Sequence, residues 1–206
     1  DGVTAYANWG HETQAELYGI IGKIMREEFP QKIFEGSVHN TYSVHYFHGG
    51  VPTRLSEKYR QSWDTMKQEN VDAVVMTNLF DHWENSLVLP CYERGDFIMR
   101  YAEYQKERLF GKAFRMSQSP ELVLTNYIDM LPHARKMEFE IIAFPTANPV
   151  KAIQVGLEIT GDNGKVIHTF PQTAITLDRL QVLRFELPFE KFIGQRAVVP
   201  RITGEY

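Results

Sequence analysis

Hydrophobic and polar positions in the first 110 residues follow helical and extended patterns in turn. Apolar residues recur at helical spacing up to Pro30, so the sequence predicts a helix over residues 14–28. A second helical pattern covers residues 56–69. Residues 32–47, between the two, partly alternate in the manner of one strand or two short strands. Helices and strands are therefore expected to follow one another along this part of the chain.

A nearly unbroken apolar run follows the second helical pattern. It consists of Ala73, Val74, Val75 and Met76, and a short run of this kind is typical of a strand buried on both faces. We therefore predict a strand over residues 72–79 in the middle of a layered sheet. Helix, strand, helix and strand joined by short connections are typical of a small α/β unit with parallel strands.

The segment 96–104 has apolar residues at alternating positions. They include Phe97, Met99 and Tyr101, and a turn signal at residues 94–95 precedes them. Alternation with this period indicates a strand. We expect this strand to return antiparallel to the preceding extended segment.

Alternating segments dominate after residue 111. They cover residues 137–143, 152–159, 165–170, 180–185 and 197–202. The turn sequence Gly-Asp-Asn-Gly separates two of these segments, which indicates a hairpin. Short strands at this spacing are typical of a sandwich. The predicted fold class is therefore α+β, with a small α/β layered unit over residues 1–110 and an antiparallel β-sandwich over residues 111–206.

Composition and charge narrow the functional classes only slightly. Of the 206 residues, 43% are apolar, which is enough to build a core. The net charge is −4, and basic residues are scattered among acidic ones, so nucleic acid is not an expected partner. A single cysteine, Cys91, excludes an intramolecular disulfide and a cysteine-based zinc site. No apolar run is long enough for a membrane span, and the compartment stays open, with an extracytoplasmic location favoured.

A dense polar cluster follows the predicted central strand. Its members are Asn78, Asp81, His82, Trp83, Glu84 and Asn85. In open α/β sheets, ligands bind where parallel strands end. We therefore expect any ligand of this chain to bind beside these residues.

Two groups of histidines are candidate metal ligands. His82 and Glu84, with a third ligand from the later His133 or His168, have the composition of a two-histidine, one-carboxylate iron site, and we take His168 as the third ligand. This set and the following Arg179, which could bind a cosubstrate carboxylate, resemble the ligand pattern of 2-oxoglutarate-dependent oxygenases. That resemblance implies a small metal-dependent enzyme that holds iron or zinc.

The second group lies in the extended segment after the first helix. His39, His45 and His48 could also hold a metal, although histidines in a strand more often make ordinary cross-strand hydrogen bonds. Without a metal site of either kind, no cofactor is expected.

The order of segments resembles a known family of membrane enzymes. A helix ending at Pro30, a strand, a helix over residues 56–69 and the run Val-Asp-Ala-Val-Val-Met over residues 71–76 are similar to the soluble extracytoplasmic domain of multi-spanning lipid-sugar-dependent glycosyltransferases. Residues 154–159 and 164–166 resemble carbohydrate-associated sandwiches. The resemblance implies an accessory domain without its own catalytic site, attached to a membrane-embedded remainder of the same chain.

The sequence therefore leaves two candidate functions. The first is a binding or accessory module for carbohydrate or a cell-envelope component. Its candidate stacking residues are Trp83, Trp63, Tyr42 and Tyr46, all of which could instead belong to a core. The second is the metal-dependent enzyme that uses His82, Glu84 and His168.

Overall fold

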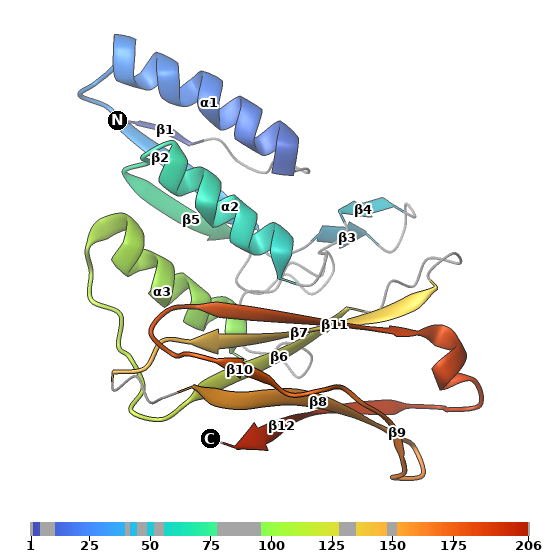
Figure 1. Ribbon diagram of the computed structural model, residues 1–206. Coiled ribbons are helices and arrows are strands. Elements are labelled where there is room, and N and C mark those ends of the chain that lie inside the picture. The colour runs from blue at the N-terminus through green and yellow to red at the C-terminus, as the bar shows by residue number, and fades with distance from the viewer. Residues whose placement is uncertain are drawn as a thin grey trace. The chain divides into compact units, whose positions relative to one another are not determined.

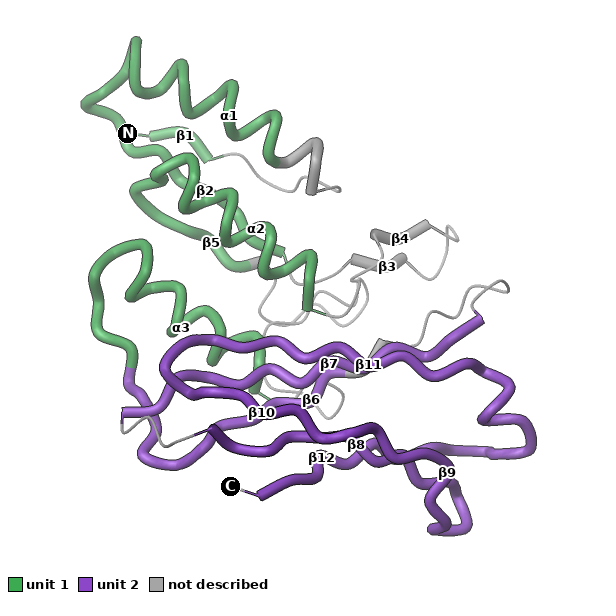
Figure 2. Tube along the Cα trace, in the orientation of Figure 1, with its two compact units in different colours: residues 1–114 green, residues 115–206 purple. Residues whose placement is uncertain are grey.

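The computed structural model describes residues 2–4, 11–39, 42–44, 49–51, 56–77, 96–127, 135–147 and 152–205. The fold is mixed α and β, as predicted, and its sheets are mostly antiparallel (Figure 1). The chain divides into two compact units, residues 1–114 and residues 115–206 (Figure 2). Each unit is described by itself below.

A parallel three-stranded sheet forms the base of unit 1. Its strands are β1 (Gly2–Thr4), β2 (Ile33–His39) and β5 (Ala73–Thr77), in the order β1-β2-β5. The helices are α1 (His11–Glu28), α2 (Glu57–Gln68) and α3 (Phe97–Phe110), and the short strands β3 (Tyr42–Val44) and β4 (Gly49–Val51) form an antiparallel pair. The helices predicted over residues 14–28 and 56–69 are confirmed as α1 and α2.

Both α1 and α2 cover the same face of this sheet (Figure 1). Phe34, Gly36 and Val38 alternate along β2 and are all buried. The ring of Tyr18 on α1 packs against Phe34, with 5.9 Å between centroids. Gly36 faces α2 so closely that an added Cβ would overlap the Sδ atom of Met66. The alternation of β2 therefore matches the side on which the helices pack.

The strand predicted around residues 73–76 is confirmed as β5 with a parallel neighbour, but among the described residues the prediction that it is central and buried on both faces is wrong. Among the described strands of this sheet β2 is the middle one, and β5 pairs with β2 alone. All four residues are only half-buried. Apolar content indicates burial, but it does not say how many neighbours a strand has. The start of β5 is fixed by Asp72, whose carboxylate and N–H bind the N–H and C=O of Phe34 at 2.8 Å each.

The strand predicted over residues 96–104 is also wrong, because this segment begins helix α3. Phe97 and Tyr101 are four residues apart, so the same apolar residues that alternate also line one helical stripe. Both rings pack against Tyr59 of α2, whose hydroxyl donates a hydrogen bond to the C=O of Ile98 at 3.0 Å. Gly111 ends the helix in the left-handed conformation, with φ of 63°.

Unit 2 consists of two antiparallel sheets. One has the order β11-β7-β6, and the other has the order β10-β8-β12 with β9 also paired to β8. The strands are β6 (Glu121–Tyr127), β7 (Lys136–Phe144), β8 (Ile153–Gly161), β9 (Val166–Thr169), β10 (Thr173–Ile175), β11 (Gln181–Pro188) and β12 (Val198–Glu205), with a short 3₁₀ helix at Phe189–Phe192. The five predicted segments lie in or overlap β7, β8, β9, β11 and β12. Sequence analysis missed β6 and β10.

The two sheets of unit 2 share one hydrophobic core. Phe139 and Ile141 of β7 belong to it, as do Val155 and Leu157 of β8, and all four are fully buried. In β8 the neighbouring position Gln154 is exposed, as alternation predicts, whereas in β7 the intervening residues Glu140 and Ile142 are also fully buried. The hairpin predicted between β8 and β9 is confirmed by the hydrogen bond from the N–H of Gly161 to the C=O of Lys165.

Candidate functional site at the carboxyl edge of the parallel sheet

Two parallel strands of unit 1 end side by side. His39 is the last residue of β2, Thr77 is the last residue of β5, and the two are register partners. Ligands of open α/β sheets bind outside the carboxyl ends of the strands. The carboxyl edge of β2 and β5 is therefore the candidate site, at the end of the sheet that the sequence predicts.

A serine and a histidine form a hydrogen-bonded pair at this edge. Ser37 and His39 are two residues apart, so their side chains share one face of β2. The Oγ atom of Ser37 lies 2.9 Å from Nε2 of His39. Ser37 is fully buried and His39 is half-buried. The face that carries them is opposite to the face on which α1 and α2 pack.

Helix α1 fixes the position of the pair. The N–H of Ser37 donates a hydrogen bond of 2.6 Å to the hydroxyl oxygen of Tyr18. Burial raises the pKa of Tyr18 to about 12, against a smaller opposing effect of the Ser37 N–H. The tyrosine is therefore neutral at physiological pH, and it holds the end of β2 through a hydrogen bond that does not change with pH.

Burial also sets the charge of the histidine. It lowers the pKa of His39 below its ordinary value of 6.5, so the imidazole is neutral at pH 7. A neutral imidazole has one N–H donor and one acceptor nitrogen, and a serine hydroxyl can also both donate and accept. The half-buried imidazole, held by the buried Ser37, therefore suits a partner whose groups both donate and accept hydrogen bonds.

The same face of β2 is polar over most of its length. Glu35 precedes Ser37 by two residues, and its carboxylate accepts a hydrogen bond from the hydroxyl of Thr4 on β1. Glu35, Ser37 and His39 thus form a polar row that ends at the carboxyl edge. Its two ends, Glu35 and His39, are partly exposed, whereas Ser37 between them is fully buried.

The polar cluster predicted after the strand lies outside the described residues. It comprises Asn78, Asp81, His82, Trp83, Glu84 and Asn85, so its part in the site stays a prediction. The described structure contributes Thr77, the residue directly before the cluster.

The two predicted metal sites are only partly described. His168 is on β9 in unit 2, where its ring meets Phe170 edge to face with 4.5 Å between centroids. His82, Glu84, His133, His45 and His48 lie outside the described residues. Within the described ranges, no three histidine, cysteine or acidic side chains gather in a metal-binding group. The hydrogen bond that His39 makes with Ser37 lies within β2, whereas the expected alternative to a metal was a cross-strand hydrogen bond.

The predicted stacking residues have different outcomes. Trp63 is 2% exposed and packs edge to face with Tyr59, so it belongs to the core and its use as a stacking surface is wrong. Tyr42 is on β3, where the backbone alone is described. Tyr46 and Trp83 lie outside the described residues.

Sequence analysis did not single out Ser37 or Tyr18. The spacing of Ser37 and His39 on a predicted strand was a signal that their side chains meet. Tyr18 gave no comparable signal, because it lies 19 residues before Ser37 and reaches it only through the packing of α1.

Comparisons with known proteins add no relative. No family model matches the chain, and no curated protein or solved structure matches it. None of the described helices combines the length and apolar composition that a membrane span requires. The resemblance to the soluble domain of lipid-sugar-dependent glycosyltransferases therefore stays a prediction.

Proposed function

We propose that this chain is an accessory module that binds carbohydrate or another hydroxyl-rich component of the cell envelope and has no catalytic site of its own. The ligand binds at the carboxyl edge of β2 and β5. The observation that carries this proposal is the pair formed by Ser37 and His39. Such a ligand fits an extracytoplasmic location and a membrane-embedded remainder of the same chain.

The charge state of the pair supports a neutral ligand with hydroxyl groups. The lowered pKa of His39 disfavours a cationic imidazole, and an anionic ligand would require that charge for strong attraction. A sugar hydroxyl donates one hydrogen bond and accepts others, as do a serine hydroxyl and a neutral imidazole. The polar row that includes Glu35 extends the same chemistry along β2.

Unit 2 supports the proposal through its architecture. We propose that its two antiparallel sheets, which share one core, form a β-sandwich of the kind associated with carbohydrate. This sandwich would present or support the binding unit rather than perform chemistry.

The test is sugar binding by the whole chain and by two histidine variants. Ligands found on a glycan array are titrated calorimetrically against the wild type, His39→Gln and His168→Gln. Loss of one hydrogen bond at the site weakens binding by about three- to tenfold. We expect this loss in His39→Gln, while His168→Gln, a variant of unit 2, binds as the wild type does.

The competing metal enzyme predicts the opposite result. If His82, Glu84 and His168 hold iron or zinc, protein purified without chelator contains stoichiometric metal, and His168→Gln loses it. Metal analysis of the same three proteins therefore distinguishes the two functions. Absence of any array ligand, or equal binding by His39→Gln, would contradict the proposed site.

A further inference from the structure

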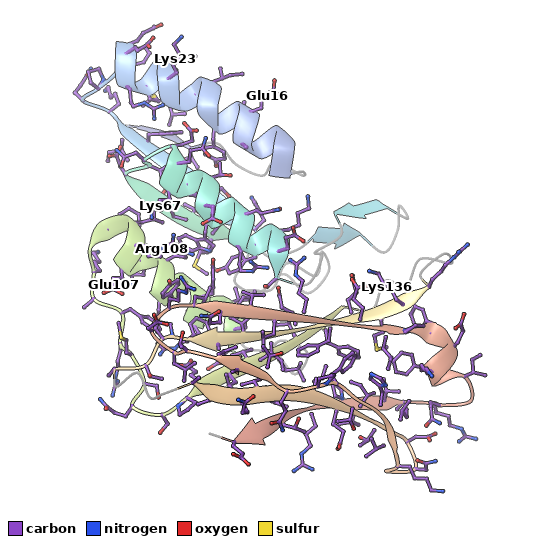
Figure 3. The ribbon with its side chains drawn as sticks, viewed as in Figure 1. Glu16, Lys23, Lys67, Glu107, Arg108 and Lys136 are labelled. Carbon is purple, nitrogen blue, oxygen red and sulfur yellow. The ribbon has the colours of Figure 1, made fainter. Side chains whose placement is uncertain are left out.

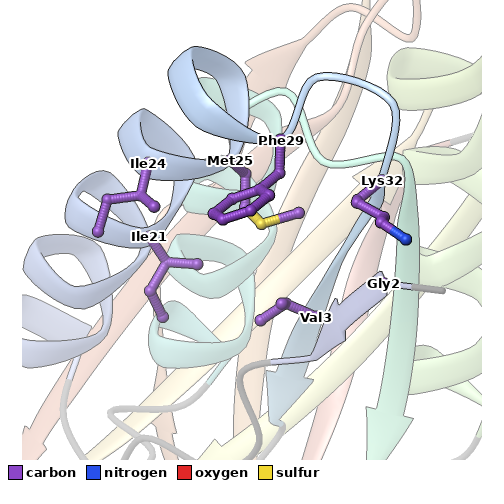
Figure 4. Close-up of a pocket in the computed structure, with 7 residues that line it drawn as sticks. All are labelled: Gly2, Val3, Ile21, Ile24, Met25, Phe29 and Lys32. Carbon is purple, nitrogen blue, oxygen red and sulfur yellow. The ribbon is translucent and has the colours of Figure 1, made fainter.

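An apolar cavity of about 360 Å³ lies at the other end of the parallel sheet (Figure 4). Its lining residues are Gly2, Val3, Ile21, Ile24, Met25, Phe29 and Lys32. Gly2 begins β1 and is the register partner of Ile33, which begins β2. The cavity is therefore at the amino ends of the strands, whereas His39 is at a carboxyl end. It is a separate place from the proposed carbohydrate site.

The wall of this cavity is accessible from solvent. Val3, Ile24 and Phe29 are 42%, 42% and 43% exposed, although large apolar side chains are usually covered. Met25 is 5% exposed and is the most deeply buried side chain of the wall. The volume of the cavity lies in the range of small-molecule pockets, which are roughly 300–1,000 Å³. An exposed apolar hollow of this kind marks a binding site.

Lys32 supplies the charge of the cavity. It is the charged residue among the described lining residues, and its ammonium lies at the margin, beyond the apolar side chains (Figure 4). An aliphatic chain can bury its methylenes against Ile21, Met25 and Phe29. An anionic head group at the end of that chain then lies beside Lys32. The lining is thus complementary to a molecule with one apolar end and one negative end.

We propose that this cavity binds a single-chain anionic amphiphile of the fatty-acid class. The ligand is a separate molecule, because the exposed side chains described on α1 carry both signs of charge and form no basic patch for an anionic bilayer. Glu16 and Lys23 both project from α1, and Glu27 and Glu28 are exposed near its end (Figure 3). A bilayer is held by a cluster of basic residues, which this mixed surface lacks among its described residues, whereas a single head group needs only Lys32.

The first experiment needs no variant. The whole chain is titrated calorimetrically with sodium salts of hexanoic to dodecanoic acid, each below its micelle concentration. We expect each added methylene to tighten binding by about fourfold, which corresponds to about 0.8 kcal/mol, until the chain fills the cavity. Binding that does not depend on chain length would overturn the proposal, as would no binding of any acid.

Two matched pairs of variants locate the ligand. Ile24 lines the cavity and Ile20 does not, and both are exposed isoleucines of α1. We expect Ile24→Ser to weaken decanoate binding about tenfold and Ile20→Ser to leave it unchanged. Lys32→Gln should weaken decanoate up to about fivefold but not decanol, with Lys23→Gln as its control.

The variants also separate a cavity from a general apolar surface. If Ile20→Ser and Ile24→Ser weaken decanoate binding equally, the ligand covers the helix face and does not enter the cavity. Binding to phosphatidylglycerol vesicles without binding to decanoate would assign the patch to a membrane surface. Either result contradicts the proposal. All four substituted side chains are exposed or lie at the surface, and circular dichroism verifies that each variant is folded.

Discussion

Gly36 of β2 packs closely against Met66 of α2, and replacing this glycine with alanine tests how tightly unit 1 is packed. A Cβ at this position would overlap the Sδ atom of Met66 and would lie 3.2 Å from Cγ1 of Val71. Met66 is fully buried, so its side chain has no solvent-exposed space into which to move. Gly36→Ala should therefore destabilise unit 1.

The size of the effect follows from two opposing contributions. Adding a methyl group to a well-packed core costs about 1–3 kcal/mol. Replacing glycine inside a strand gains about 0.5–1 kcal/mol, because alanine loses less conformational entropy on folding. We expect a net decrease of about 1 kcal/mol, and at most about 2.5 kcal/mol, in the free energy of unfolding.

Urea unfolding followed by tryptophan fluorescence measures this change in unit 1. All three tryptophans of the chain, Trp9, Trp63 and Trp83, lie in residues 1–114. Gly19→Ala is the matched control, because the nearest atom to an added Cβ there is Oε1 of Glu69 at an ordinary 3.8 Å. Gly19→Ala should stabilise α1 by about 0.5–1 kcal/mol.

A second substitution identifies the cause of the loss. In a Met66→Ala background the overlapping sulfur is absent, so Gly36→Ala should no longer destabilise the protein. If Gly36→Ala is as stable as the wild type, or if its cost is unchanged beside Ala at position 66, the close packing of β2 on α2 is refuted.

Three further predictions concern the site and the core of unit 2. Tyr18→Phe removes the acceptor of the buried Ser37 N–H and should lower the free energy of unfolding by about 1–3 kcal/mol, measured by tryptophan fluorescence; a neutral result would show that this hydrogen bond is dispensable. The pKa of His39 is lowered in the folded state, so the unfolded chain takes up the proton first on acidification. The contribution of the neutral His39 to the free energy of unfolding is fully present above pH 6.5. It decreases as the pH falls below 6.5, by at most about 1.4 kcal/mol per pH unit. His39→Gln should remove this pH dependence, as measured by urea titrations at about pH 5.5 and 7.5. Leu157→Ala in the shared core of unit 2 should cost about 2–5 kcal/mol in unfolding followed by circular dichroism, whereas Val166→Ala, at an exposed position of β9, should cost far less.

Local patterns predicted several elements because they depend on residues close together in the chain. Helices α1 and α2 follow from apolar spacing and from Pro30, which ends the first of them. The hairpin between β8 and β9 follows from the turn sequence over residues 161–164. The mixed α and β class follows from the change of period after residue 111.

Segment 97–110 shows the limit of such patterns. Its apolar residues fit alternation and a helical stripe equally well, and the choice depends on the packing of Phe97 and Tyr101 against Tyr59, about 40 residues earlier in the chain. The position of β5 in its sheet also depends on residues far away in the chain, because it is set by the strands that pair with β5. Neither fact can be read from the segment itself.

The sequence by itself indicated that His39 belongs to an extended segment over residues 32–47 and that polar residues follow the next strand. Only the tertiary structure decided which groups meet at that edge, because Tyr18 reaches Ser37 through the packing of α1 on β2. The cavity at the opposite end has the same cause, since the folding of α1 over β1 brings Val3 beside Ile24 and Phe29. Contacts between residues far apart in the chain depend on how elements pack, and periodicity within one element carries no information about them.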